Sequence, residues 1–231
     1  MSSWRTAYRS FYYENLPDLP DIVLPAAETA LLVIDLQNCY LPSSPPSDAD
    51  PAALSEWNRW APFRERLRST VLPNTQRLLA RFRALGRDVL FARIACLTPD
   101  GRDRSLSQAR PGFNNLLLPH TAEESQILPQ VAPLPHEIVL TKTTDSALTG
   151  TALRLLLQNL RIRHVVVCGI FTDQCVASTV RSLADESFDV IVCDDACAAG
   201  TDELHRAELT ILNNIYCQVL TTEETLAALQ P

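Results

Sequence analysis

The chain has 231 residues, of which 46% are hydrophobic and 20% charged, the composition of a globular protein that can bury a core. Its net charge of −7 argues against nucleic-acid binding, which depends on clustered cations that neutralise phosphates. No apolar run approaches the roughly 20 residues that a membrane-spanning helix needs. Neither a nucleic acid nor a membrane is therefore an expected partner.

The N-terminal segment and the cysteines bear on the cellular compartment. The first residues, MSSWRTAYRSFYYENLP, contain no apolar core of a signal peptide. The seven cysteines are an odd number, match no paired framework and mostly lie in apolar runs. We therefore expect free thiols in the reducing environment of the cytoplasm.

Apolar runs along the chain predict strands that alternate with helices. Runs rich in β-branched residues predict five buried strands and a shorter sixth, at Ala30–Ile34, Asp88–Ala92, Glu137–Leu140, His164–Cys168, Val190–Cys193 and Cys217–Leu220. Apolar residues at helical spacing predict helices at Asn74–Leu85, Gly150–Leu160, Gln174–Ser187 and Thr201–Asn213. This alternation is typical of α/β proteins. It predicts a three-layer α/β/α sandwich with a mainly parallel six-stranded, Rossmann-like sheet.

Two long segments interrupt the alternation. Residues 40–62 are rich in Pro, Ser and Asp and are predicted as a loop with a short helix, whereas 98–135 form a proline-punctuated connection between the second and third strands. Loops of this length inside a compact domain are usually functional lids or oligomer contacts. We expect one domain over 1–231, with 1–28 as an N-terminal extension, assembled as a homodimer or homotetramer.

The cationic residues are strongly asymmetric, with nineteen arginines and a single lysine, Lys142. Lysine carries a compact point charge whose pKa changes readily on burial, whereas arginine stays planar, bulky and charged. A lone lysine in such a chain is either chance or a position where arginine cannot do the same work. Its surroundings favour the second interpretation.

Three chemically active side chains lie at the carboxyl ends of predicted strands, where open α/β sheets bind their ligands. Asp35 follows the first strand, Lys142 the third, and Cys175 lies in a turn after the fourth that leads into a helix. A helix N-terminus and a nearby ammonium both favour a thiolate. A carboxylate beside them can accept the thiol proton and later pass it to a leaving amine. The sequence thus predicts nucleophilic catalysis at this edge of the sheet.

The segments VIDLQN (33–38), TK (141–142) and GIFTDQCV (169–176) resemble those of the isochorismatase-like cysteine hydrolases. That family includes nicotinamidases, N-carbamoylsarcosine amidohydrolase and ureidoacrylate amidohydrolases. The resemblance implies that Cys175 is the nucleophile, that Asp35 is the general acid/base, and that Lys142 lowers the thiol pKa. It also implies a cis peptide between Ile170 and Phe171, and an oxyanion hole formed by the Phe171 and Cys175 N–H groups.

The reaction expected from this resemblance is metal-independent hydrolysis of a C–N bond in a small amide, ureido or carbamoyl compound. It passes through a thioester and needs no cofactor. Nicotinamidases place metal-binding histidines after the first strand, but none of the histidines here (His120, His136, His164, His205) falls in 40–72. Isochorismate hydrolases generally lack the cysteine. Nicotinamidase- or isochorismatase-type hydrolysis of a small cyclic substrate, or a non-enzymatic thiol redox role, remain as alternatives.

Candidates for substrate binding are less specific. Arg93 and Arg102 follow the second strand, where an arginine can hold a substrate carboxylate through two hydrogen bonds, but loop arginines are also often simply solvated. Gln37 can support the catalytic residues or form hydrogen bonds with the backbone of a turn. Tyr40 and Trp60 can line the pocket or belong to the core.

Overall fold

The sheet has the predicted architecture. The computed structural model describes residues 6–17 and 20–230, so parts of the predicted 1–28 extension lie outside the described residues. Six parallel strands follow the order β4-β3-β2-β5-β6-β7. Their bounds are β2 Thr29–Ile34, β3 Val89–Ile94, β4 Ile138–Lys142, β5 His164–Ile170, β6 Asp189–Ala198 and β7 Gln218–Leu220. The predicted α/β sandwich with a parallel six-stranded sheet is confirmed.

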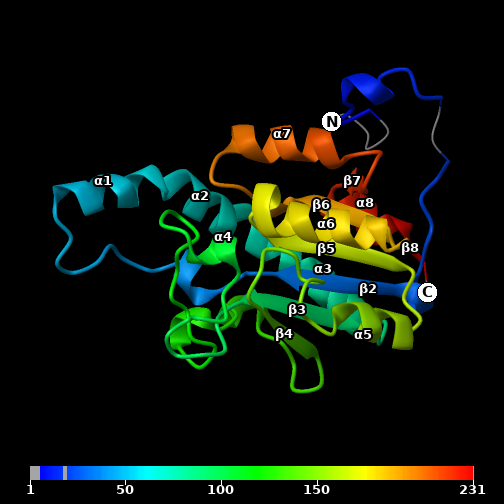
Figure 1. Cartoon of the computed structure of the whole chain (residues 1–231). Helices are drawn as coiled ribbons and strands as arrows, with labels where there is room; N and C mark the ends of the chain where they lie inside the picture. The colour runs from blue at the N-terminus through cyan, green and yellow to red at the C-terminus, as the bar shows by residue number, and fades with distance from the viewer. Residues whose placement is uncertain (1–5, 18–19, 231) are drawn as a thin grey trace.

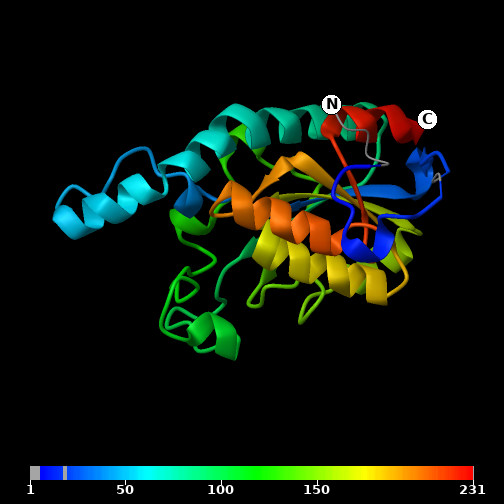
Figure 2. The same ribbon diagram turned by 90° about the horizontal axis from the view of Figure 1, so that it is seen from above.

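Helices cover both faces of the sheet. Figure 2 shows α3 (Leu72–Ala84) and α8 (Thr222–Ala228) on one face, and α6 (Ala177–Asp185) and α7 (Asp202–Leu212) on the other. The remaining crossover helix, α5 (Leu153–Asn159), connects β4 to β5. All six residues of β2 are buried, as expected for a central strand covered on both faces.

The segment 40–62 is more helical than predicted. It contains α1 (Pro51–Arg59) and the start of α2 (Ala61–Arg66), which continues through a π-helical turn at Leu67–Val71 into α3. Asp50 caps α1 by accepting a hydrogen bond from the Ala53 N–H at 2.8 Å, and proline occupies the first helical position, two strong start signals. In both ribbon views α1 projects from the body of the molecule (Figures 1 and 2).

Two further elements were not predicted. Helix α8 starts with a capping box between Thr221 and Glu224. A two-stranded parallel sheet pairs β1 (Leu24–Pro25) with β8 (Leu229–Gln230), so the end of the N-terminal extension lies beside the C-terminal residues. The connection 98–135 holds α4 (Leu106–Ala109) and two short 3-10 turns, at Glu123–Ser125 and Pro129–Val131.

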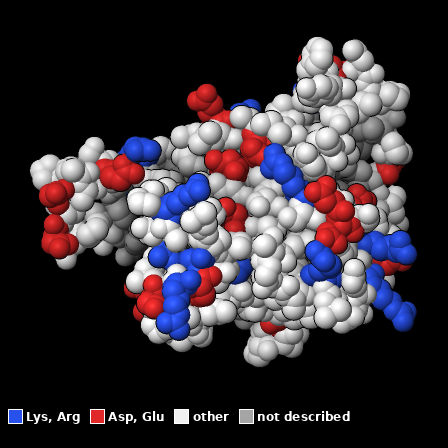
Figure 3. All heavy atoms as spheres, in the orientation of Figure 1, with Lys and Arg blue, Asp and Glu red and all other residues white. Residues whose placement is uncertain are grey.

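Charge and hydropathy bear on the expectation about nucleic acids and membranes. On the face seen in Figure 3, arginine side chains are interspersed with Asp and Glu. Among the described residues, none of the helices combines the length and the apolar character that crossing a membrane requires.

Gly169 of β5 pairs with Ile34 of β2 in the centre of the sheet and has φ +124°. A Cβ at this position would lie 2.0 Å from the carbonyl oxygen of Ile34, so the two strands would have to separate.

We expect Gly169→Ala to lower the free energy of unfolding by more than about 4 kcal/mol, measured by urea denaturation, or to prevent folding. Gly86→Ala is the matched control. Gly86 has φ +61°, and no atom lies within 4 Å of the position that an alanine methyl would take, so only about 1–2 kcal/mol of backbone strain is expected. Equal losses in the two variants would contradict this explanation.

Candidate active site

The three predicted catalytic residues meet at the point where the sheet changes winding direction. From β2 the chain crosses to β3 on one side, and later places β5 against the other side of β2. Asp35 directly follows β2, and the segment with Cys175 directly follows β5. Lys142, the last residue of β4, pairs with Ile94 of β3 in the sheet register. Ligands of open α/β sheets bind at such a switch point.

The Lys142 ammonium joins the three side chains. Nζ lies 2.8 Å from Asp35 Oδ2, donates a hydrogen bond to Cys175 Sγ at 3.2 Å and another to the carbonyl oxygen of Thr144 at 3.2 Å. The side chain of Lys142 is completely buried and that of Asp35 nearly so. Three acceptors therefore match the three N–H donors of the ammonium.

Local backbone geometry sets the directions of these groups. Asp35 has φ +52°, a left-handed conformation that few non-glycine residues adopt and that recurs at functional sites. The peptide between Ile170 and Phe171 is cis. Cys175 lies in a π-helical turn, Thr172–Val176, in which the Phe171 carbonyl accepts hydrogen bonds from the N–H groups of Gln174 and Val176.

A buried polar network holds this turn from behind. Thr172 Oγ1 and His205 Nδ1 are 2.8 Å apart, and His205 Nε2 lies 2.8 Å from Asp194 Oδ1. Arg66 of α2 reaches the same site and donates to the Asp194 and Cys197 carbonyls. The network ties the cysteine turn to α7, β6 and α2.

Burial and the charges of neighbouring groups together set the pKa values of the three side chains. It raises the pKa of Asp35, an effect that the Lys142 charge opposes. Burial would lower the pKa of Lys142, but the negative charges of Asp35 and Cys175 outweigh it, so the pKa of Lys142 is raised. Burial and the Asp35 charge together raise the pKa of Cys175 well above its usual value, although Lys142 acts in the opposite direction.

Lys142 acts on the thiol pKa as expected, but the pKa of Cys175 is not lowered overall. The Lys142 charge lowers the thiol pKa, but the nearly complete burial of Cys175 and the neighbouring Asp35 carboxylate raise it by more. The resting site therefore contains an ion pair and a neutral thiol. Such a thiol needs a base to remove its proton as it attacks.

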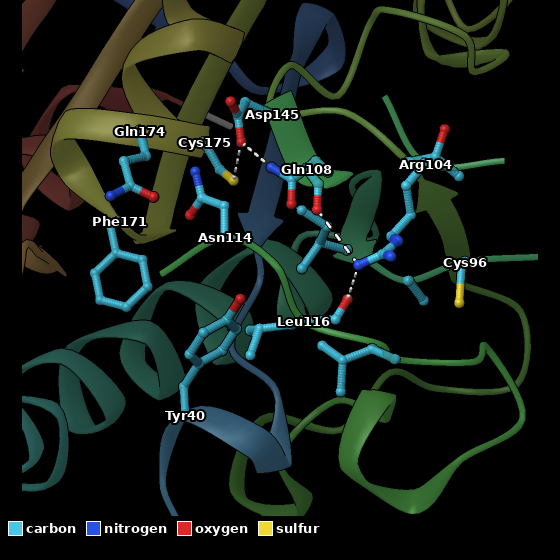
Figure 4. A pocket seen from close by; sticks show the side chains of 14 residues that line it. Tyr40, Cys96, Arg104, Gln108, Asn114, Leu116, Asp145, Phe171, Gln174 and Cys175 are labelled. Atoms are coloured by element: carbon cyan, nitrogen blue, oxygen red, sulfur yellow. Dashed lines mark hydrogen bonds between the residues drawn. The ribbon is translucent and has the colours of Figure 1, made fainter. Parts of the chain in front are cut away.

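Cys175 forms part of the wall of a cavity of about 20 Å³, which we call the thiol cavity. That volume is about enough for one water molecule. Figure 4 shows Asp145 and Cys175 side by side, with Gln108 directed at Asp145 and with Tyr40 and Phe171 on another wall.

A larger apolar cavity of about 530 Å³, the aromatic cavity, shares Tyr40, Leu116 and Phe171 with the thiol cavity. Trp57 and five aromatic rings that pack against one another form part of its walls; the five are those of Tyr40, Trp60, Phe63, Phe113 and Phe171. The rings of Trp60 and Phe113 stack with centroids 5.1 Å apart, and those of Phe63 and Phe171 at 4.9 Å. Its size falls within the range of pockets that hold small ligands.

Three of the predicted substrate-binding residues lie outside these cavities, which corrects the prediction for them. Gln37 is fully buried, and its amide bonds the main chain of Ile94 and the Ser125 carbonyl. Arg93 donates to Gln126 and Thr141, and the exposed Arg102 side chain pairs with Asp100. The first two are held by neighbouring loops and strands, and the third is directed at solvent. Tyr40 and Trp60 do line cavities, as predicted.

The sequence interpretation missed the polar wall of the thiol cavity. Asp145 Oδ1 lies 3.7 Å from Cys175 Sγ and accepts a hydrogen bond from Gln108 Nε2 at 2.5 Å. Asn114 and Gln174 also line this cavity. Asp145 lies three residues after Lys142, so its place just beyond the end of a strand could have identified it as a candidate site residue. Gln108 and Asn114 lie in the long 98–135 connection, where no pattern singles them out.

Redox chemistry would involve the cysteines, and metal binding would need a cluster of His, Cys, Asp or Glu side chains. All seven cysteines are free thiols. Within residues 6–17 and 20–230, no group of three or more His, Cys, Asp or Glu side chains is placed to hold a metal ion.

Comparisons with known proteins agree with the geometry. An isochorismatase domain matches residues 29–224. The uncharacterized isochorismatase family protein YddQ of Bacillus subtilis (strain 168) is 28% identical over 208 residues, 86% of this chain and 98% of its own. The ureidoacrylate amidohydrolase RutB of Pseudomonas syringae pv. syringae (strain B728a) is 27% identical over 241 residues, 94% of each chain.

Solved structures share the fold. The N-carbamoylsarcosine amidase from Thermoplasma acidophilum superposes with a TM-score of 0.63 at 22% identity, over 85% of this chain and 97% of its own. At that identity the likeness concerns the fold alone. Because the domain match covers most of the chain, the protein belongs to the isochorismatase family of hydrolases.

Proposed function

We propose that the protein is a metal-independent cysteine hydrolase that cleaves a C–N bond of a small amide, ureido or carbamoyl compound through a thioester. The observation that carries this proposal is the buried cluster of Asp35, Lys142 and Cys175, with the thiol at the wall of a small cavity. The similarity to a ureidoacrylate amidohydrolase supports it.

The proposed reaction begins with a proton transfer from the neutral thiol. Asp35 takes the proton of Cys175 as Sγ bonds to the substrate carbonyl carbon. The negative charge that develops on the carbonyl oxygen is held by the N–H groups of Phe171 and Cys175, in the manner of an oxyanion hole. Asp35 then passes the proton to the leaving nitrogen as the C–N bond breaks, which releases ammonia or an amine and leaves a thioester.

Water completes the cycle. Asp35 removes a proton from the water that attacks the thioester carbonyl, and the acid product leaves as the thiol regains its proton. Lys142 keeps Asp35 ionised through these steps and fixes the direction of the sulfur. Each step uses only side chains and water, so no metal or cofactor takes part.

The non-reacting part of the substrate has an apolar place to bind. We assign Tyr40 and Trp60 to its walls, because both line the aromatic cavity and Tyr40 also lines the thiol cavity. The five packed rings favour a second candidate function, hydrolysis of a cyclic amide of the nicotinamidase type, since flat rings pack well on aromatic side chains. Assembly as a homodimer or homotetramer and a cytoplasmic location stay predictions.

A substrate panel tests the proposed function. Linear amides, ureides, N-carbamoyl amino acids and a cyclic amide are incubated with the protein, ammonia is measured, and intact mass is recorded at short times. We expect Cys175-dependent ammonia release that a chelator leaves unchanged, with an added acyl mass on the protein. Absence of both ammonia and adduct across the panel would reject the proposal. Loss of activity with chelator would reject metal independence.

A further inference from the structure

Asp145 is a carboxylate at the nucleophile that the proposed cycle does not use. The Cys175 thiol donates to its Oδ1 over 3.7 Å, and its side chain is half-buried at the wall of the thiol cavity. Figure 4 shows its carboxylate directed to the same space as the sulfur. A second negative charge so close to the sulfur disfavours the thiolate, and Asp145 contributes to the raised pKa of Cys175. Its charge therefore does not stabilise the thiolate.

The position of Asp145 is held by Gln108. Gln108 is almost fully buried, and its Nε2 donates to Asp145 Oδ1 at 2.5 Å. Gln108 is fixed in turn within α4. Its N–H donates to the capping Ser105 Oγ at 3.4 Å, and its carbonyl oxygen accepts from Arg104 Nη1 at 3.4 Å. The long connection thus reaches the end of β4 and orients one carboxylate at the cavity.

The nearby cation forms no ion pair with Asp145 in the part of the chain that the structure describes. Arg104 lines the same cavity, but its Nε donates to the Gly101 carbonyl, and its Nη1 to the Leu116 carbonyl and the Asn115 side chain. The charged group beside the sulfur, apart from the catalytic cluster, is therefore an acceptor.

We infer that Asp145, oriented by Gln108, binds the N–H groups of the scissile nitrogen, and so selects unsubstituted amides and carbamoyl groups. This inference rests on the proposed function. A carbonyl carbon bonded to Sγ carries its nitrogen as a direct substituent, which brings that nitrogen within hydrogen-bonding reach of an acceptor 3.7 Å from the sulfur. An ionised carboxylate only accepts hydrogen bonds, and those it accepts are strong.

The same geometry rejects substrates without an N–H at this position. An ester oxygen or a dialkylated nitrogen presents no donor, so the half-buried carboxylate gains no hydrogen bond from such a substrate beyond the one it accepts from Gln108. Sites built to bind a substrate N–H or O–H discriminate strongly against analogues that lack it. The substrate class is therefore a primary amide, or a ureide with a terminal carbamoyl NH₂, rather than an ester or a tertiary amide.

The test compares leaving groups in Asp145 variants. The best primary amide of the panel, its N,N-dimethyl amide and its methyl ester are assayed with wild type, Asp145→Asn and Asp145→Ala. We expect kcat/KM for the primary amide to fall about 10- to 100-fold in Asp145→Ala, and less in Asp145→Asn, which keeps an acceptor oxygen. Ester hydrolysis is expected to change by less than about 3-fold, so the amide-to-ester ratio falls. Gln108→Leu is expected to shift the ratio in the same direction.

The controls separate this inference from its alternatives. Asp100→Asn, in the same connection but exposed and paired with Arg102, should leave both activities unchanged. If Asp145 were a base for the thiol or for the attacking water, or were only structural, amide and ester hydrolysis would fall together. That result, or an unchanged amide rate, would overturn the inference while Cys175-dependent hydrolysis kept the proposed function. If no amide is hydrolysed at all, both fall.

Discussion

Cys175→Ala is expected to lower kcat/KM by at least about 10⁴-fold, because the variant retains the cavity but has no atom that can form the thioester. Cys175→Ser should be nearly as inactive. A hydroxyl is far harder to deprotonate than a thiol, and the burial that raises the thiol pKa acts on a serine as well. Ammonia release gives the rate, and intact mass after rapid quenching shows whether an acyl group is attached.

A different buried cysteine supplies the matched control. Cys217 is a free thiol buried just before β7, at the edge of the sheet farthest from β4. Cys217→Ala should keep the activity and the acyl adduct. Substantial hydrolysis by Cys175→Ala, or an adduct that persists in it, would show that another group is the nucleophile.

Lys142→Arg is expected to keep the positive charge but lose at least about 100-fold in kcat, since displacements of about 1 Å in an active site have effects of this size. The ammonium meets Asp35, Cys175 and the Thr144 carbonyl from one compact centre inside a fully buried space. A planar guanidinium is larger and presents its donors as a fork, so it cannot reproduce all three contacts. Steady-state rates together with urea unfolding separate lost catalysis from lost folding.

Comparison variants show which property of Lys142 matters. Lys142→Met leaves the Asp35 carboxylate buried without its partner, and we expect a loss of about 3–5 kcal/mol in the free energy of unfolding besides lost activity. Arg163→Lys, at an exposed ion pair with Glu28, is the conservative control and should change neither quantity. If Lys142→Arg proves nearly as active as wild type, the single lysine has no catalytic meaning.

Much of the fold could be predicted from the sequence because it depends on local pattern. Each predicted strand overlaps an observed one, since β-branched apolar runs such as residues 164–168 suit only a strand covered on both faces. The prediction was weakest in 40–62, where proline and serine suggested a loop. There the Asp50-Pro51 helix start, visible in the sequence, outweighed the composition.

The substrate-binding predictions show where local pattern ends. Arg93 and Arg102 were predicted to bind substrate because they follow a strand, but neither lines the two cavities at the site. Arg93 is hydrogen-bonded to Gln126 in a loop, and Arg102 is exposed to solvent and paired with Asp100. Asp145 and Gln108 are 37 residues apart in the sequence. They are in contact because of the path that the irregular 98–135 connection takes. No periodicity encodes such a contact.

By itself, then, the sequence determined the order of strands and helices and the convergence of Asp35, Lys142 and Cys175, because side chains just past parallel strands share one edge whatever the loops do. Only the tertiary structure decided that the thiol is neutral and that a second carboxylate stands beside it. Both depend on burial and on contacts between distant segments. The catalytic cluster is thus placed by the strands, whereas Gln108 reaches Asp145 only through the way the 98–135 connection packs against them.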